Sequence, residues 1–498
     1  MNRCFPAFVI AILLLGIVPS HGADGNSSVA IGSAANEDQW IEVQSSHFNV
    51  LTDGGEKPGR ELAQQFEQLR SAFSQLFAGQ HVKQTVPLQI IALRNSRQIS
   101  QYSRLYQGKP IKSTGFCLRS PDRDYIVLDL GALNWWETVI HEYAHLLLAG
   151  SSPDLPAWFN EGFAELYSTI RIDDRHATLG RPPESVLQVL RNETLMPVSS
   201  LFRVDRDSPV YNEDSDPRSI FYAESWLVVH YLWDHNEIEQ AQRYLQLIRQ
   251  RVPVAEAVKQ AFDMEPEQFD RILQKYSRSG IEAVRIVLPQ GLEQASFSVK
   301  PVSALDATTA LAGLHSHQPD YQEQAIRELQ EVLQQDPDNA AAHRDLGYIY
   351  YHARDPEEAL PHLQKAAEKS PSDWRVHFFW AELTAQKYDD ALAPLIEKEA
   401  RRVIELNPDF ADGYGLLGFA FMVERRNPEA TAAYQRALAL KPASEVYALN
   451  LAELYSLQGK LDEARALFLY LQNSGNPVIA TAARSHLELM ASPKLREE

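Results

Sequence analysis

Hydrophobic positions in the first 130 residues follow two different periods. Over residues 40–53 the apolar side chains fall mostly on alternate positions, which predicts a half-buried strand. Over residues 62–77 they recur at every third or fourth position, which predicts an amphipathic helix. Residues 88–93 are a second run of strand length, and a polar segment separates the runs 115–118 and 125–130, which is typical of a hairpin.

From residue 134 to about residue 276 the pattern predicts helices, and we expect no strand there. Together with the preceding strands, this predicts an α+β domain over residues 39–288, with a small mixed sheet and helices. Residues 289–305 contain two prolines and no clear period, so we interpret them as a linker.

The last part of the chain repeats itself. Prolines close helix-like stretches at a nearly constant interval, and small residues recur in the same register. This resembles the tetratricopeptide repeat, in which two antiparallel helices cross too closely for a large side chain. We expect an all-α solenoid of about five units over residues 306–490. The markers are Pro337, Pro371, Pro408 and Pro442, with Gly313, Gly347, Ala381, Gly418 and Ala452.

The first 23 residues have the composition of a signal peptide. Arg3 precedes an apolar run from Phe5 to Val18, and small residues follow it. Residues 24–38 are rich in Gly, Ser, Asn and Ala, and we expect a flexible start there. No later run is long and apolar enough to cross a bilayer. We therefore expect an exported protein, periplasmic or extracellular, with no integral membrane segment in the mature chain.

The charge balance narrows the set of partners. The 498 residues include 66 Asp and Glu against 47 Lys and Arg, for a formal net charge of −19. Such a chain is repelled by phosphate backbones, so we expect no nucleic acid partner. The only cysteines are Cys4, in the leader, and Cys117, which excludes an intrachain disulfide in the mature chain. We interpret Cys117 as a small buried apolar residue.

Residues 141–145 read His-Glu-Tyr-Ala-His within a predicted helix. A spacing of four places His141 and His145 on the same helix face, close enough to hold one ion. Glu142 lies one step around the helix, where a carboxylate can reach a water on that ion without binding the metal. This is the H-E-x-x-H pattern of zinc peptidases.

A third ligand is expected from the next helix, where residues 155–167 include the run Trp-Phe-Asn-Glu-Gly-Phe-Ala-Glu. This run after H-E-x-x-H resembles the gluzincins, especially the peptidase MA-like proteins. The resemblance implies that Glu161 completes a site for one Zn²⁺. Glu165 remains a rival, because its separation from His145 is the thermolysin-like one. With Glu161 as the ligand, Glu165 resembles the acid that orients the first histidine.

A later helix supplies one further candidate. Residues 221–232 resemble the segment of the aminopeptidases of this clan in which a tyrosine donates to the oxyanion, and the matching position is Tyr222. A core aromatic is the alternative for Tyr222. The resemblance implies a zinc metallopeptidase in which metal-activated water attacks a peptide bond and Glu142 is the general base. The amino-terminus signature of the aminopeptidases is absent, which favours an endopeptidase.

Two other functions stay open at this point. The repeats would recruit a peptide or protein substrate, or a protein partner, through their groove. One alternative is therefore a tetratricopeptide scaffold protein with a structural or degenerate zinc domain. The other is hydrolysis of a bond other than a peptide bond by the same zinc centre.

Overall fold

The computed structural model describes residues 39–491 with several gaps, and its residues fall into two compact units, Asp38–Tyr321 and Gln322–Glu498. The predicted signal peptide and flexible start lie outside the described residues, and export stays a prediction. None of the helices in the described ranges combines the length and hydrophobicity that a bilayer span requires. The gaps are residues 77–85, 107, 112, 121, 133–134, 152–154, 174–175, 206–219, 251, 289–295 and 388.

A six-stranded mixed sheet forms one half of the first unit, in the order β11-β1-β2-β3-β7-β6. The central strands β2, β3 and β7 are parallel, and β6 runs antiparallel to β7 as the predicted hairpin. The predicted strand over residues 40–53 is two strands, because Ser45 and Phe48 close a turn between them. The strands are β1 (Trp40–Gln44), β2 (Asn49–Thr52), β3 (Leu88–Leu93), β6 (Gly115–Leu118), β7 (Asp124–Asp129) and β11 (Ser298–Val302).

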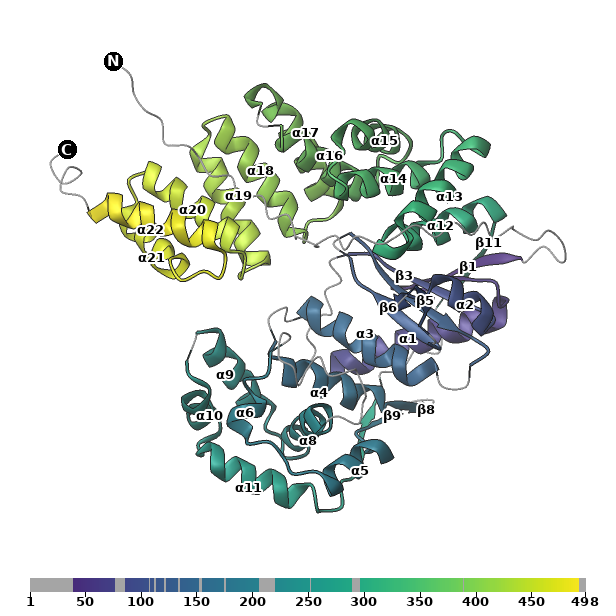
Figure 1. Ribbon diagram of the computed structural model, residues 1–498, viewed down its shortest axis with the longest axis vertical. Helices are drawn as coiled ribbons and strands as arrows, with labels where there is room; N and C mark the ends of the chain where they lie inside the picture. The colour runs from purple at the N-terminus through teal and green to yellow at the C-terminus, as the bar shows by residue number, and fades with distance from the viewer. Residues whose placement is uncertain are drawn as a thin grey trace. The chain divides into compact units, whose positions relative to one another are not determined.

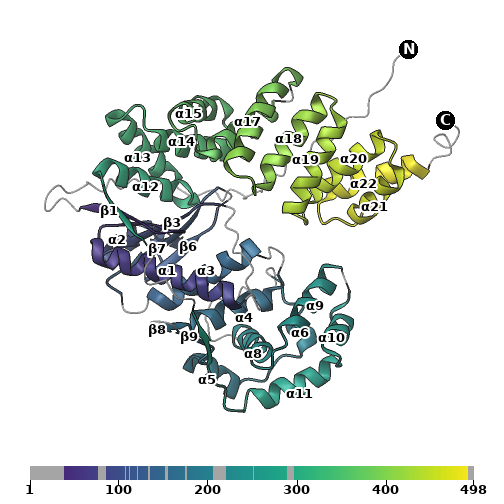
Figure 2. The ribbon, with the colours of Figure 1, turned by 180° about the vertical axis from the view of Figure 1, so that it is seen from behind.

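Both faces of the central strands β3 and β7 are buried, which explains their apolar runs over residues 90–93 and 125–128. Ile90 and Ile126 face the core formed with α1 (Glu56–Leu76) and α3 (Trp135–Ser151), which confirms the predicted amphipathic helix over residues 62–77. Their neighbours face α2 (Ser96–Tyr102) and α12 (Ala304–Ser316). Figures 1 and 2 show α1 and α12 on opposite sides of the strands.

The helix α12 is fixed to the sheet by polar contacts as well as by Leu314. The Nε2 atom of His317, just after the helix, lies 3.0 Å from Oδ1 of Asp122 in the β6–β7 turn. His315 makes a different contact, with the carbonyl of Gln101. These two histidines therefore serve separate structural contacts, as their spacing of two predicts.

The other half of the first unit is mainly helical and surrounds α8, whose side chains are buried on nearly every face. A three-stranded sheet, in the order β10-β9-β8, lies beside it. The expectation of no strand between residues 134 and 276 is therefore wrong. β8 and β9 are short, and β9 pairs with the distant β10, which a local pattern does not reveal. The elements are α4 (Ala157–Ser168), β8 (Arg171–Asp173), β9 (His176–Leu179), α5 (Glu184–Asn192), α6 (Val198–Leu201), α8 (Ile220–Asp234), α9 (Ile238–Arg249), α10 (Val254–Phe262), α11 (Pro266–Tyr276) and β10 (Val284–Val287); a short ladder pairs β4 (Leu105–Tyr106) with β5 (Lys109–Pro110).

The predicted linker over residues 289–305 differs from the structure in its described part. β11 occupies residues 298–302 and pairs antiparallel with β1, so that Ile41 lies opposite Pro301. The division between the units comes later, after Tyr321. We interpreted Pro301 as a sign of a linker, but β11 is an edge strand, and an edge strand tolerates a proline where no N–H is needed for pairing.

The second unit is the helical stack that the repeats predict, and its axis can be followed by colour in Figure 1. At Gly347 and Gly418 an added Cβ would come within 2.7 Å of Leu363 and 2.9 Å of Tyr434, on the partner helices, so the small residues mark the crossings. The helices are α13 (Gln322–Gln335), α14 (Ala340–His352), α15 (Pro356–Lys369), α16 (Trp374–Ala385), α17 (Ala393–Leu406), α18 (Ala411–Val423), α19 (Asn427–Leu440), α20 (Glu445–Leu457), α21 (Leu461–Leu471) and α22 (Pro477–Ala491), with 3₁₀ turns η2 (Pro319–Tyr321) and η3 (Asp390–Leu392).

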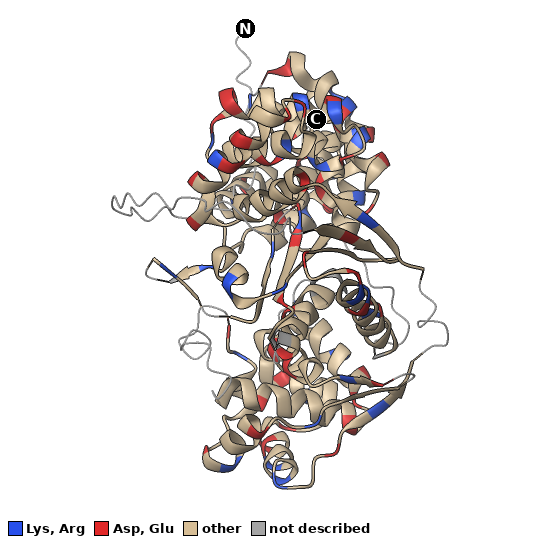
Figure 3. Cartoon of the chain, turned by 90° about the vertical axis from the view of Figure 1, so that its right-hand side faces the viewer, with Lys and Arg blue, Asp and Glu red and all other residues tan. Residues whose placement is uncertain are grey.

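Acidic residues are distributed over both units rather than gathered in one of them. Figure 3 shows red and blue segments along the helices of the repeats and along those of the first unit. Many of the acids in the repeats are paired, as Asp373 is with Arg344 and Arg375. The net charge of the chain therefore does not identify one binding face.

Candidate metal centre

Three side chains from two neighbouring helices meet in the first unit. His141 and His145 lie one turn apart on α3, and Glu161 lies on α4. One ligand atom from each of the three lies within 4.8 Å of the others. The two Nε2 atoms are 3.1 Å apart, and Oε2 of Glu161 is 3.5 Å from that of His141 and 3.4 Å from that of His145.

The second nitrogen of each imidazole is also held. Nδ1 of His145 lies 3.0 Å from Oδ1 of Asn160, and Nδ1 of His141 lies 3.5 Å from Oε1 of Glu165. These contacts leave both Nε2 atoms directed toward Glu161, as the ligands of a single ion require. Glu161 therefore faces both Nε2 atoms, whereas Glu165 contacts only the far side of His141.

Close packing of α4 against α8 positions Glu161. At Gly162 an added Cβ would come within 2.2 Å of the carbonyl oxygen of Ser225 on α8. Only glycine permits this approach of two backbones. The glycine next to Glu161 is therefore part of what brings that carboxylate to the histidines.

The electrostatics of the cluster favour a cation. Burial would lower the pKa of His141, but its hydrogen bond with Glu161 and the negative charges of Glu165 and Glu142 outweigh burial and raise that pKa to about 9. Burial would likewise raise the pKa of Glu161, yet hydrogen bonds from His141 and His145 hold it well below its usual range. Burial raises the pKa of Glu165. The carboxylate of Glu161, which stabilises a positive charge on His141, also provides the negative charge that a metal ion needs.

Of the two residues predicted to be catalytic, Glu142 lies on a helix that builds this cluster, and Tyr222 lies on the helix packed against α4. Glu142 follows His141 on α3, and Tyr222 lies in the first turn of α8. Burial, followed by the charges of Glu161, Glu165 and Glu142, raises the pKa of Tyr222 to about 12. Tyr222 is thus within the electrostatic influence of the acids of the cluster and is only partly buried against the core.

Sequence reasoning missed the contact between Asn160 and His145, although Asn160 was part of the motif. Its position directly before Glu161 was the available signal. His230, on α8, forms hydrogen bonds with the hydroxyl of Tyr276 and the carbonyl of Gly180. Burial raises the pKa of Cys117, in agreement with an unreactive thiol.

Comparison with known proteins finds a family match in the repeat region of the chain. The tetratricopeptide repeat family matches residues 303–373. The Hsp70-Hsp90 organizing protein of Triticum aestivum is 34% identical over 102 residues, covering 20% of this chain and 16% of that protein. Protein O-mannosyl-transferase TMTC1 of Homo sapiens is 30% identical over 125 residues, covering 25% of this chain and 14% of that protein. The chain therefore spans only a small part of the length of these relatives.

Solved structures give similar matches. The crystal structure of MamA is 22% identical, with 38% of this chain and 98% of MamA covered and a TM-score of 0.28. YrrB, a TPR protein with an unusual peptide-binding site, is 17% identical, with 36% of this chain and 90% of YrrB covered and a TM-score of 0.32. Scores this low carry no argument about function. The family match shows that residues 303–373 contain tetratricopeptide repeat sequence.

The predicted zinc metallopeptidase is contradicted by these comparisons. The matched family is the tetratricopeptide repeat, and neither curated relative is named as a peptidase. The assignment as a hydrolase, protease or endopeptidase is therefore wrong, and a peptide substrate has no support. The gluzincin resemblance rested on two short motifs. Such motifs fix where ligand atoms lie on two helices, and this geometry does not by itself establish turnover.

Proposed function

We propose that this chain is a protein-binding scaffold in which the repeats recruit a protein partner and the first unit is stabilised by one Zn²⁺ ion. The convergence of His141, His145 and Glu161 within 4.8 Å carries the metal part of the proposal. The match of residues 303–373 to the tetratricopeptide repeat supports the scaffold part.

The donor set fits zinc among common metal ions. Two imidazole nitrogens and one carboxylate oxygen are ligands that Zn²⁺ accepts, whereas Ca²⁺ and Mg²⁺ prefer oxygen alone. Glu161 is 4% exposed, so its charge is shielded from bulk water and needs a positive partner. The contacts of Asn160 and Glu165 hold the imidazole rings in orientations that suit a shared ion.

A zinc ion in this place would connect α3 to α4 by strong metal–ligand bonds. Because the three ligands come together only when both helices are folded, binding would favour the folded state of the first unit. The ion is thus assigned a structural role. The repeats lie outside the cluster, and their helix pairs are held by apolar packing together with hydrogen bonds and ion pairs between helices, as between His377 and Glu399.

Two variants of the full chain test the two parts separately. His141→Ala removes a ligand, and Gly418→Leu places a large side chain where a Cβ already meets Tyr434 at 2.9 Å. We expect His141→Ala to lose its zinc, measured by mass spectrometry of the purified protein, and to keep its partner in cross-linking and affinity capture. We expect Gly418→Leu to keep its zinc and to lose the partner.

Matched controls are available in both units. His176→Ala removes a histidine from β9, outside the cluster, and Gly475→Ala changes a glycine of the repeats that has nothing within 4 Å of its added Cβ. Both should keep zinc and partner. A wild-type chain without stoichiometric zinc contradicts the metal part, and capture of the same protein by Gly418→Leu contradicts the recruitment by the repeats.

A further inference from the structure

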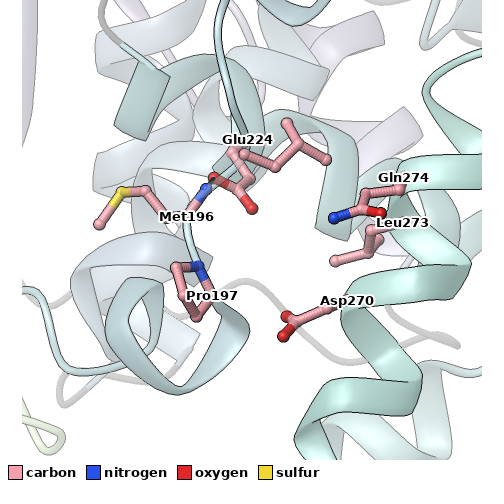
Figure 4. A pocket seen from close by; sticks show the side chains of 7 residues that line it. Met196, Pro197, Glu224, Asp270, Leu273 and Gln274 are labelled. Carbon is pink, nitrogen blue, oxygen red and sulfur yellow. Dashed lines mark hydrogen bonds between the residues drawn. The ribbon is translucent and has the colours of Figure 1, made fainter.

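A small cavity in the first unit lies between α8, α11 and the segment that leads into α6. Its volume is about 60 Å³, which is room for one ion with one or two waters. Figure 4 shows the carboxylates of Glu224, from α8, and Asp270, from α11, both facing this space, with the amide of Gln274 at its border. Apolar side chains complete the lining, namely those of Leu195, Met196, Pro197 and Leu273.

Each of the two carboxylates uses one oxygen to hold the same backbone segment. The N–H of Met196 donates to Oε2 of Glu224 at 2.8 Å, and the N–H of Val198 donates to Oδ1 of Asp270 at 2.7 Å. The second oxygen of Glu224, Oε1, is buried and has no hydrogen-bond partner among the described residues. Glu224 is 0% exposed, so bulk water does not reach this oxygen.

An unpaired buried carboxylate oxygen is costly unless a proton or a cation satisfies it. Burial, with the negative charge of Asp270 acting against ionisation, raises the pKa of Glu224 to about 8. In the folded chain this carboxyl therefore keeps a proton unless a cation takes the place of that proton. All of its charged donors are oxygen atoms, and two carboxylates match the charge of a divalent ion.

We propose that Glu224 and Asp270 form a Ca²⁺ site that connects α8, α11 and the segment before α6. Hard cations such as Ca²⁺ and Mg²⁺ bind oxygen ligands of this kind, whereas zinc is bound mainly by imidazole and thiolate groups, which this cavity lacks among its lining residues. Ca²⁺ tolerates an irregular arrangement of ligands better than Mg²⁺ does, and waters in the cavity complete its coordination. This site is separate from the histidine cluster and does not depend on the proposed role of zinc.

The test uses the full chain after treatment with a chelator, titrated with CaCl₂ alone by isothermal titration calorimetry. We expect one saturable site in the wild-type chain and at least a tenfold weaker affinity in Glu224→Gln and in Asp270→Asn. The control Glu267→Gln removes an exposed acid from the same helix, α11, and should bind as the wild type does.

Circular dichroism of each variant without Ca²⁺ separates a loss of binding from a loss of folding. Asp270 is only partly buried, so Asp270→Asn keeps the test valid if Glu224→Gln does not fold. Absence of saturable Ca²⁺ binding in the wild type overturns the proposal. So does an unchanged affinity for Ca²⁺ in Asp270→Asn.

Discussion

The two units of this chain are held together in different ways. In the repeats, each helix packs mainly against its neighbours in sequence, and the same crossing recurs with a small residue. In the first unit, the pairs that close the fold are distant in sequence, as when Ile41 lies opposite Pro301 and Ala177 lies opposite Ile286.

This difference has consequences for stability. In a stack of repeats a local change is felt by the adjoining helices, and each interface contributes on its own. In the first unit, the sheet and the helices around α8 share one large core, so a single displaced helix affects the whole unit. Three predictions test this comparison, from the largest expected effect to the smallest.

The largest effect is expected from Gly162→Ala. The new methyl group would meet the backbone carbonyl of Ser225 at 2.2 Å, and backbone cannot rotate away, so α4 must shift. We expect a loss of about 3 kcal/mol or more in the free energy of unfolding, together with loss of zinc. Denaturant unfolding followed by circular dichroism, with metal analysis, measures both.

The matching change in the repeats is Gly347→Ala. Its methyl group would meet the side chain of Leu363, which can change rotamer, and we expect a smaller cost of about 1–2 kcal/mol. Gly280→Ala, where nothing lies within 4 Å, should change stability little. Equal losses for Gly162→Ala and Gly347→Ala would show that the two units respond alike.

The second prediction concerns α12, which belongs to the repeat pattern in sequence and to the sheet in structure. Leu314 is fully buried against Ile91, Tyr125 and Val127. We expect Leu314→Ala to cost about 2–4 kcal/mol and to speed amide exchange in β3 and β7. Hydrogen exchange read by mass spectrometry locates the effect.

Leu457→Ala serves as the comparison, because Leu457 is 58% exposed in the repeats. It should leave exchange in both units unchanged. Faster exchange confined to the repeats in Leu314→Ala would mean that α12 acts as a repeat helix only.

The smallest effects are opposite responses to pH. Because the pKa of Glu224 is raised to about 8 in the folded chain, the folded state keeps a proton that the unfolded chain has lost, and stability falls as pH rises from about 5 to 8. Burial, with His343, lowers the pKa of His362 to about 4, so there stability falls as pH drops from about 6.5 to 4. The two units should thus weaken at opposite ends of the pH range.

Substitutions isolate each contribution. Relative to the wild type, Glu224→Gln should gain on the order of 2 kcal/mol between pH 5 and pH 8. His362→Gln should gain about 1 kcal/mol between pH 6.5 and pH 4, a smaller amount because this half-buried imidazole is partly screened by solvent. Thermal unfolding across this range measures both, with Glu267→Gln and His352→Gln as exposed controls. If the stability of a variant and that of the wild type changed in parallel with pH, the substituted residue would not be the source of the pH dependence.

The sequence predicted well wherever structure depends on neighbours along the chain. The repeat register was readable because each helix pair reproduces the same crossing, and the β6–β7 hairpin was readable because its strands are adjacent. The pairing of β9 with β10 was missed, and β11 was interpreted as a linker. Both strands are short and depend on partners that no local period identifies.

The candidate site was predicted to a similar degree. Helical spacing was enough to place His141 and His145 together, and a family resemblance suggested Glu161. Gly162 is required because α4 packs closely against α8, which follows more than fifty residues later in the chain. The sequence alone does not show that these two helices are in contact. The carboxylates of Glu224 and Asp270 come from separate helices with no motif between them. Turnover was inferred from motif alone, and that inference failed.

The pairing of β1 with β11 bears on how the chain responds to tension. Trp40 lies opposite Val302, so the chain enters and leaves this pair of strands at the same end. A pulling force applied across these two residues would act along the inter-strand hydrogen bonds and open them one after another. The same bonds would resist together if the force were applied at opposite ends of the strands. The edge of the sheet is therefore built to unzip at low force.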